Sequence, residues 1–98
     1  MAYSIEQFVE EVSVLIQSVG GRPRLVYVGI TDDLKRRFTE HGLLSTDRVS
    51  CFDAGSLKKA QLIENYFVNG IGTDGGPGGE TEESRFVYAY LKRRHTNP

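Results

Sequence analysis

The sequence predicts one small α+β domain in which residues 1–98 form a three-stranded mixed or antiparallel sheet flanked by helices. Two observations lead to this fold class. Three stretches with the 3–4 residue spacing of amphipathic helices alternate with three short stretches rich in β-branched and aromatic residues. A chain of 98 residues with 39% apolar side chains can also bury only one core.

The first helix is expected to begin after Ser4. Ser4 followed by Gln7 has the spacing of a capping box, and the glycines at residues 20–21 end the apolar stripe. A strand is expected over residues 24–28. Gly29 follows at a position where the backbone must bend or pass close to another group.

Two more helices and a second strand come next. Acidic residues open a helix over residues 33–41, and a strand is expected over residues 48–52. Ser56 caps a third helix that runs to about Asn69 and closes at Gly70. With the final strand, these elements give the α-β-α-β-α-β order of a small sheet covered by helices.

The last quarter of the chain is expected to hold a loop, a strand and a loose tail. Residues 73–84 are rich in glycine and acids and are predicted as a loop. For the glycine-rich stretch 72–79, a flexible surface loop is favoured over a phosphate cradle, because no Lys-Ser or Lys-Thr pair and no helix follow it. Alternation over residues 85–91 predicts a strand with its tyrosines on one face, and the basic tail 92–98 is expected to fray.

Charge and composition narrow the function classes. The net charge of −1 argues against strong non-specific binding to a long polyanion. No apolar run approaches the roughly 20 residues of a membrane span, and the start lacks the features of a secretion signal. One cysteine and two histidines leave no internal disulfide and no zinc site. We therefore expect a cytoplasmic protein with no membrane partner.

Two helices carry side chains that could take part in chemistry. Arg37 and His41 are four residues apart and share a face that, with Tyr27 of the preceding strand, could bind a phosphate. The alternative is a solvated basic face on which Arg37 pairs with Asp33. On the third helix, Glu64 falls within the apolar stripe, where an unpaired carboxylate costs several kcal/mol. Glu64 therefore either pairs with a base or lines a site.

Residues 27–41 combine several chemically distinctive residue types at defined spacings. They are Tyr27, Gly29, Thr31, Leu34, Arg37 and His41. Together they resemble the second half of the GIY-YIG nuclease signature, in which a Tyr-Ile-Gly strand leads through a Thr into a helix carrying an Arg and then a His. Residues 60–64 resemble the family's second helix, where an acidic residue holds a divalent metal, and residues 48–52 fit its third strand. The resemblance covers about residues 24–70.

The resemblance implies a metal-dependent endonuclease that hydrolyses phosphodiester bonds in nucleic acid, with DNA expected more than RNA. It implies that Arg37 stabilises phosphate charge, that Glu64 binds one Mg²⁺ or Mn²⁺, and that Tyr27 and His41 are acid/base candidates. A cation and a guanidinium together neutralise the charge that develops in the transition state. Because the chain has no room for a separate recognition domain, a protein partner or self-association is also expected.

One part of the family pattern has no counterpart before Tyr27. The family's first strand, with its Gly-Ile-Tyr motif, would fall where a helix is predicted. The final strand could pair beside Tyr27 and fill that place, as in a circular permutation, so that Tyr88 or Tyr90 replaces the missing tyrosine. The alternative is that these two tyrosines are half-buried sheet residues, which β-propensity alone explains.

Two other functions stay open. The scaffold could serve a catalytically inactive binding protein, such as an inhibitor or a sensor of a phosphate ligand. Alternatively, Arg37 and Glu64 could form an internal ion pair in a domain that only mediates protein contacts.

Overall fold

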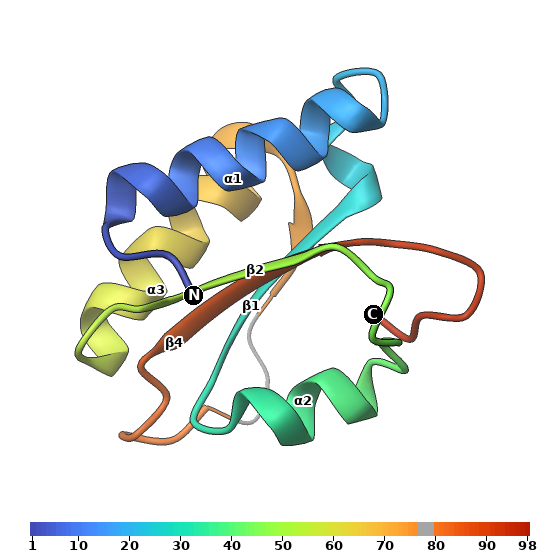
Figure 1. Cartoon of the computed structure of the whole chain (residues 1–98). Coiled ribbons are helices and arrows are strands. Elements are labelled where there is room, and N and C mark those ends of the chain that lie inside the picture. The colour runs from blue at the N-terminus through green and yellow to red at the C-terminus, as the bar shows by residue number, and fades with distance from the viewer. Residues whose placement is uncertain (77–79) are drawn as a thin grey trace.

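A mixed sheet separates the helices into two layers. The computed structural model describes residues 1–76 and 80–98. In Figure 1, α1 (Ile5–Ser18) and α3 (Leu57–Asn65) cover one face of the sheet, and α2 (Leu34–Glu40) covers the other. The strands are β1 (Val26–Thr31), β2 (Val49–Asp53), β3 (Asp74–Gly75) and β4 (Phe86–Leu91), in the spatial order β2-β4-β1-β3. The α+β class is confirmed, and the described residues form four strands where three were predicted.

The last strand of the chain lies in the middle of the sheet. β4 pairs antiparallel with β1, with Tyr90 opposite Tyr27 and Tyr88 opposite Gly29, and antiparallel with β2 on its other side. The expected pairing beside Tyr27 is therefore present. Tyr88 and Tyr90 are sheet residues, but because a central strand is covered on both faces they are fully buried, where the alternative expected them half-buried.

A short strand corrects the loop predicted over residues 73–84. β3 pairs in parallel with β1, with Val28 opposite Gly75. A Cβ on Gly75 would overlap the carbonyl oxygen of Val28, so only a glycine lets the two backbones come this close. The glycine that signalled a loop is thus what permits a strand pairing. Residues 77–79 of the expected flexible loop lie outside the described residues.

The apolar core fills the space between the sheet and the layer of α1 and α3. Ser4 caps α1 as predicted, and its Oγ accepts the N–H of Gln7 at 3.1 Å. Phe8 is fully buried and packs edge-to-face on Phe67, with ring centroids 5.8 Å apart. Other core residues include Val12, Leu15, Val26, Val28, Ile30, Ala60, Ile63, Val87 and Ala89. This packing holds α3 against the sheet and so determines where the helix presents Glu64.

The third helix is α-helical only to Asn65, but the helical segment runs to Ile71, past the predicted end near Asn69. After α3 the chain continues as a π-helical turn, η2 (Tyr66–Ile71), which stops at Gly72 in a left-handed conformation with φ of +100°. The Phe67 carbonyl accepts the N–H groups of Gly72 and Thr73 at 2.8 and 3.0 Å. Gly70 therefore lies inside the helical segment, which leads almost directly into β3.

The tail, residues 92–98, packs beside α2, so the prediction that it frays is wrong. The Asn97 N–H donates to the His41 carbonyl oxygen at 2.7 Å, and Thr96 is buried. In Figure 1 the tail bends back from β4 and brings the C-terminus close to the end of α2. The tail thus closes one side of the space between α2 and the sheet.

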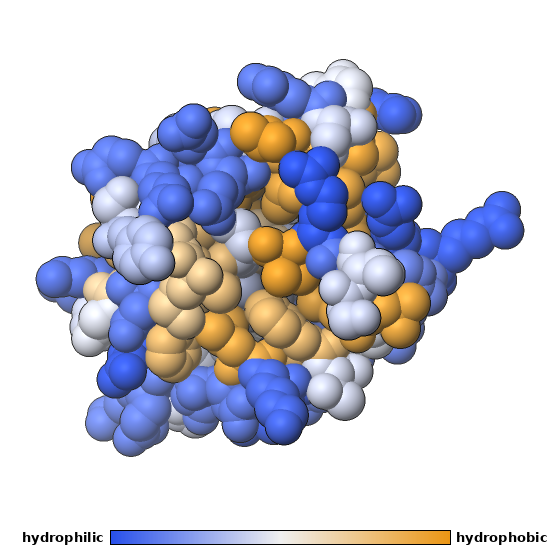
Figure 2. Space-filling view, viewed as in Figure 1, coloured by the Kyte–Doolittle hydropathy of each residue, from blue (hydrophilic) through white to orange (hydrophobic). Residues whose placement is uncertain are grey.

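The surface is largely hydrophilic but carries an apolar band. Figure 2 shows apolar residues gathered across the middle of the face seen in Figure 1, with hydrophilic residues around them. The edge strand β2 crosses this face, and its Val49 is 42% exposed. In the described part of the chain, no helix is long and apolar enough to cross a membrane.

Candidate active site

The fold brings the four predicted acid/base and phosphate-binding residues together between α2 and the sheet. Tyr27 on β1 lies beside His41 at the end of α2, with ring centroids 4.8 Å apart. Tyr88 on β4 joins them, with its hydroxyl oxygen 2.7 Å from His41 Nε2. The guanidinium of Arg37 on α2 lies close enough to the Tyr27 and Tyr88 hydroxyls to oppose the rise in both phenol pKa values. We call Tyr27, Arg37, His41 and Tyr88 the phenol–imidazole cluster.

Gly29 makes room for this cluster. A Cβ at this position would lie 2.5 Å from the Tyr88 hydroxyl oxygen and 3.0 Å from the ring of Tyr27. Both distances are too short for an ordinary contact, so a side chain on Gly29 would displace Tyr88 or its neighbour. The prediction that the backbone at Gly29 passes close to another group is confirmed, and that group belongs to the candidate site.

The hydrogen bonds of His41 indicate which ring nitrogen carries the proton. Nδ1 lies 2.7 Å from the Asn97 carbonyl oxygen, which can only accept, so the ring proton is assigned to Nδ1. Tyr90 Oη, 2.8 Å from the same nitrogen, shares that proton. Nε2 is then the acceptor for the Tyr88 hydroxyl. Burial lowers the pKa of His41, which keeps the imidazole neutral and able to accept.

Arg37 makes a different ion pair from the one expected. Its Nη1 lies 2.9 Å from Glu40 Oε1, and the expected partner Asp33 instead caps α2 by accepting the N–H of Arg36. Glu40 is about half exposed and Arg37 is 30% exposed, so the pair is open to solvent and adds little to stability. The guanidinium is therefore held beside the phenols yet can reach a ligand.

Burial is the main cause of the raised pKa values of the two phenols in the cluster. Burial, assisted by the charges of Tyr27 and Glu64 and opposed by Arg37, raises the pKa of Tyr88 to about 12. Tyr27 is half-buried, and burial also raises its pKa. Tyr27 is therefore the phenol that solvent can reach, and Tyr88 lies behind it.

Glu64 is buried on α3, as its place in the apolar stripe predicted. No basic side chain among the described residues pairs with its carboxylate. Its residue surface is 8% exposed, and its Oε2 has no hydrogen-bond partner among the described residues. Burial, assisted by the charge of Glu80, raises its pKa to about 7. Arg37 pairs with Glu40, so the expected alternative of an internal Arg37–Glu64 ion pair is wrong. Glu64 comes from α3, on the face of the sheet opposite to α2 (Figure 1), and its charge still contributes to the raised pKa of both Tyr27 and Tyr88.

A hollow of about 420 Å³ opens beside Glu64. It is lined by Gln61, Glu64, Asn65, Val68, Asn69, Gly75, Gly76 and Glu80. In the described residues, no three His, Cys, Asp or Glu side chains are placed so that they could hold a metal ion together. The protein side chains there form no complete coordination shell. A buried carboxylate oxygen without a partner, beside a hollow rich in oxygen donors, nevertheless fits one hard cation that keeps several waters. Glu64 is the residue that would hold it.

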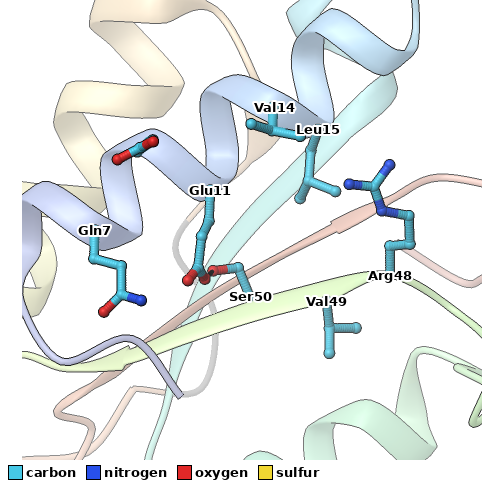
Figure 3. Close-up of a pocket in the computed structure, with 8 residues that line it drawn as sticks. Gln7, Glu11, Val14, Leu15, Arg48, Val49 and Ser50 are labelled. Carbon is cyan, nitrogen blue, oxygen red and sulfur yellow. Dashed lines mark hydrogen bonds between the residues drawn. The ribbon is translucent and has the colours of Figure 1, made fainter.

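A second hollow, of about 330 Å³, lies away from this chemistry between α1 and β2 (Figure 3). The Ser50 hydroxyl donates to the Glu11 carboxylate within it, and Arg48 and Val49 form its other side. The described residues place no imidazole or phenol in its lining. It adds nothing to the candidate active site.

Two residues of the site region were not predicted. Asn97 contacts His41 Nδ1, which the predicted candidate Tyr90 also contacts, and Glu80 shares the hollow with Glu64. Each contact joins segments far apart in the chain, so no local spacing could reveal it. Only the alternation of β4, which places Tyr90 on the same face as Tyr88, was a usable signal.

Comparison with protein-family models, with curated proteins and with solved structures finds no match. The function therefore has to be argued from the geometry of the site and from the sequence resemblance.

Proposed function

We propose that the protein is a metal-dependent nuclease of the GIY-YIG type that hydrolyses phosphodiester bonds in nucleic acid, with DNA more than RNA as substrate. One observation carries the proposal. A phenol–imidazole cluster with a solvent-accessible guanidinium lies within electrostatic range of a buried carboxylate on α3 that has no partner among the described residues. Anionic phosphate and a hard cation are the ligands that satisfy such a set of groups.

The sheet supports a GIY-YIG-like fold with permuted strands. β4 lies beside β1, in the place proposed for the family's missing first strand. Its Tyr88 faces Gly29 and reaches the imidazole of His41. Tyr88 is therefore our candidate for the tyrosine that the first motif supplies in the family.

In the proposed mechanism the two tyrosines have different tasks. Arg37 binds the phosphate and stabilises the charge that builds up on its oxygens. Tyr27, the accessible phenol, loses its proton to solvent and as phenolate takes the proton of the attacking water, which it then returns to the leaving oxygen. The Tyr88 hydroxyl behind it donates a hydrogen bond to His41 Nε2. Because the Asn97 carbonyl holds the other ring proton, His41 is oriented to accept.

Glu64 would hold the Mg²⁺ or Mn²⁺ that the resemblance implies. When bound, such an ion supplies positive charge that stabilises the transition state. The Glu64 charge raises the pKa of both phenols, so its neutralisation lowers these pKa values and favours proton release from Tyr27 and Tyr88.

One observation favours a second candidate, a phosphate-binding protein without catalysis. Tyr88 is fully buried, and its pKa of about 12 makes the phenol a poor source of phenolate near neutral pH. In this alternative Tyr27 and Arg37 hold a phosphate group and Tyr88 only fills the space behind them. We propose a cytoplasmic location and a protein partner or self-association for either function.

Nicking of supercoiled plasmid in Mn²⁺ tests the nuclease. We expect Tyr27→Phe and Arg37→Ala to lower the nicking rate by about 100-fold or more, as for the loss of an acid/base or charge-stabilising group. Tyr66→Phe and Arg36→Ala are the matched controls, because both residues are exposed, and we expect both to nick like the wild type.

The outcome separates the two candidates. A purified protein that nicks at the same rate with Tyr27→Phe or Arg37→Ala owes its activity to a contaminant or to another site. A protein that never nicks but loses phosphate-induced NMR shifts on Arg37→Ala is the binding protein.

A further inference from the structure

Two carboxylates from distant segments share the hollow beside α3. Gln61, Glu64 and Asn65 come from one side of α3, and Gly75 of β3 and the following Gly76 form the adjacent wall. Glu80, in the segment that leads to β4, completes the lining. Glu64 and Glu80 are close enough for the charge of one to act on the other.

The buried carboxylate lacks a stabilising contact. Glu64 is more than nine-tenths buried, and its Oε2 has no hydrogen-bond partner in residues 1–76 and 80–98. An ionised carboxylate in this state costs several kcal/mol unless a cation or a donor reaches it. Glu64 lines the hollow and its Oε2 is unpartnered among the described residues, which together point to a ligand that donates positive charge.

The charge of Glu80 disfavours the ionised form of Glu64 when no cation is bound. Glu80 is half-buried and forms no side-chain hydrogen bond or ion pair with any described residue. Two ionised carboxylates side by side are unfavourable alone but favourable when both bind one divalent cation. The arrangement is therefore more stable with an ion than without one.

The donor atoms around Glu64 and Glu80 indicate which cations the hollow would bind. The lining adds the carboxamides of Gln61, Asn65 and Asn69, and the described residues contribute no sulfur or imidazole to it. Oxygen donors suit Mg²⁺, Mn²⁺ and Ca²⁺, whereas Zn²⁺ prefers nitrogen and sulfur. The open side of the hollow leaves room for coordinated water.

We propose that Glu80 is a second protein ligand for the divalent cation, so that Glu64 and Glu80 bind one ion between α3 and the segment before β4. This inference rests on the proposed function only in assigning that ion to Glu64. It also gives β3 a role. Its pairing with β1, with Val28 opposite Gly75, places Gly75 in the lining of the hollow that Glu64 and Glu80 share.

Titration of Mn²⁺ into the full chain, followed by the electron paramagnetic resonance signal of the free ion, tests the inference without any activity assay. We expect Glu80→Gln to weaken Mn²⁺ binding at least about tenfold and Glu64→Gln to weaken it more, since each removes a carboxylate ligand. Glu82→Gln is the matched control, because it makes the same charge change at an exposed position of the same segment. We expect it to bind Mn²⁺ like the wild type.

A second measurement guards against misfolding. The rise in melting temperature that Mn²⁺ induces should persist in Glu82→Gln and shrink in Glu80→Gln, while circular dichroism confirms that both are folded.

If Glu80→Gln binds Mn²⁺ as tightly as the wild type while Glu64→Gln does not, Glu80 is no ligand and the proposed function is untouched. If both carboxylates are needed for Mn²⁺ but plasmid is never nicked, this inference stands and the nuclease falls. Absence of Mn²⁺ binding by the wild type overturns the two-carboxylate site.

Discussion

Glu64→Gln should be more stable than the wild type, and the difference in unfolding free energy should grow as the pH rises. Glu64 has a pKa raised from 4.5 to about 7, chiefly because burial disfavours its charged form. Glu64→Gln keeps the shape of the side chain and removes its ionisation. The variant therefore isolates the free energy that the wild type spends on burying a charge.

The magnitude follows from the two pKa values. A tenfold change in proton affinity is about 1.4 kcal/mol, so a rise from 4.5 to about 7 corresponds to about 3 kcal/mol. Below pH 4.5 the carboxyl is protonated in the folded and the unfolded chain. Between pH 4.5 and about 7 only the unfolded chain releases the proton, so the wild type loses stability as the pH rises, and above about 7 the loss is complete.

Urea unfolding with EDTA, at about pH 4.5 and about pH 8, measures this loss. We expect the unfolding free energy of Glu64→Gln, relative to the wild type, to increase by about 3 kcal/mol between the two pH values. His41, whose pKa is lowered by burial, changes stability with pH in the opposite direction, but it is present in both proteins and its contribution cancels. Glu82→Gln, at an exposed position, should show no such increase. A difference that stays within about 0.5 kcal/mol across this range would refute the reasoning that Glu64 is desolvated.

Two further substitutions test the packing around the phenol–imidazole cluster. Gly29→Ala would place a Cβ 2.5 Å from the Tyr88 hydroxyl oxygen, so we expect a loss of about 1–3 kcal/mol, whereas Gly70→Ala, with its nearest contact at 3.8 Å, should leave stability unchanged or raise it. A Gly29→Ala protein as stable as Gly70→Ala would contradict the close approach. Tyr90→Phe removes a hydroxyl 2.8 Å from His41 Nδ1 and should cost about 1 kcal/mol in urea unfolding, and a variant more stable than the wild type would contradict that hydrogen bond.

The sequence predicts the features of this fold that depend on neighbours along the chain. The Ser4 cap of α1 depends on Gln7, three residues away, and the burial of Glu64 depends on its place in the apolar stripe of one helix. Gly29 marks a close approach even though the approaching group is unknown from the sequence. In each case the signal is a local spacing or a residue type with a narrow conformational use.

Contacts between distant segments are what the sequence could not predict. β3 has two residues and exists through its pairing with β1, so neither its length nor its composition identifies it. The packing of the tail depends on Asn97 meeting His41, 56 residues earlier. Likewise, nothing near Glu80 indicates that Glu64 will lie beside it. These contacts form only when the sheet order is established, and loop composition carries no information about that order.

Sheet register links the fold to the candidate site. Along β4 the tyrosines alternate with Val87, Ala89 and Leu91, so a slip of one residue would turn Tyr88 and Tyr90 into the apolar core. Gly29 lies opposite Tyr88, and among the residues of β1 only this glycine leaves space for that ring on the α2 side. The register that buries the apolar residues is thus the one that brings the phenol to His41. Loss of Gly29 should damage fold and site together, whereas loss of Glu64 should remove the site and strengthen the fold. This opposite behaviour is expected when a carboxylate is kept for a ligand and not for stability.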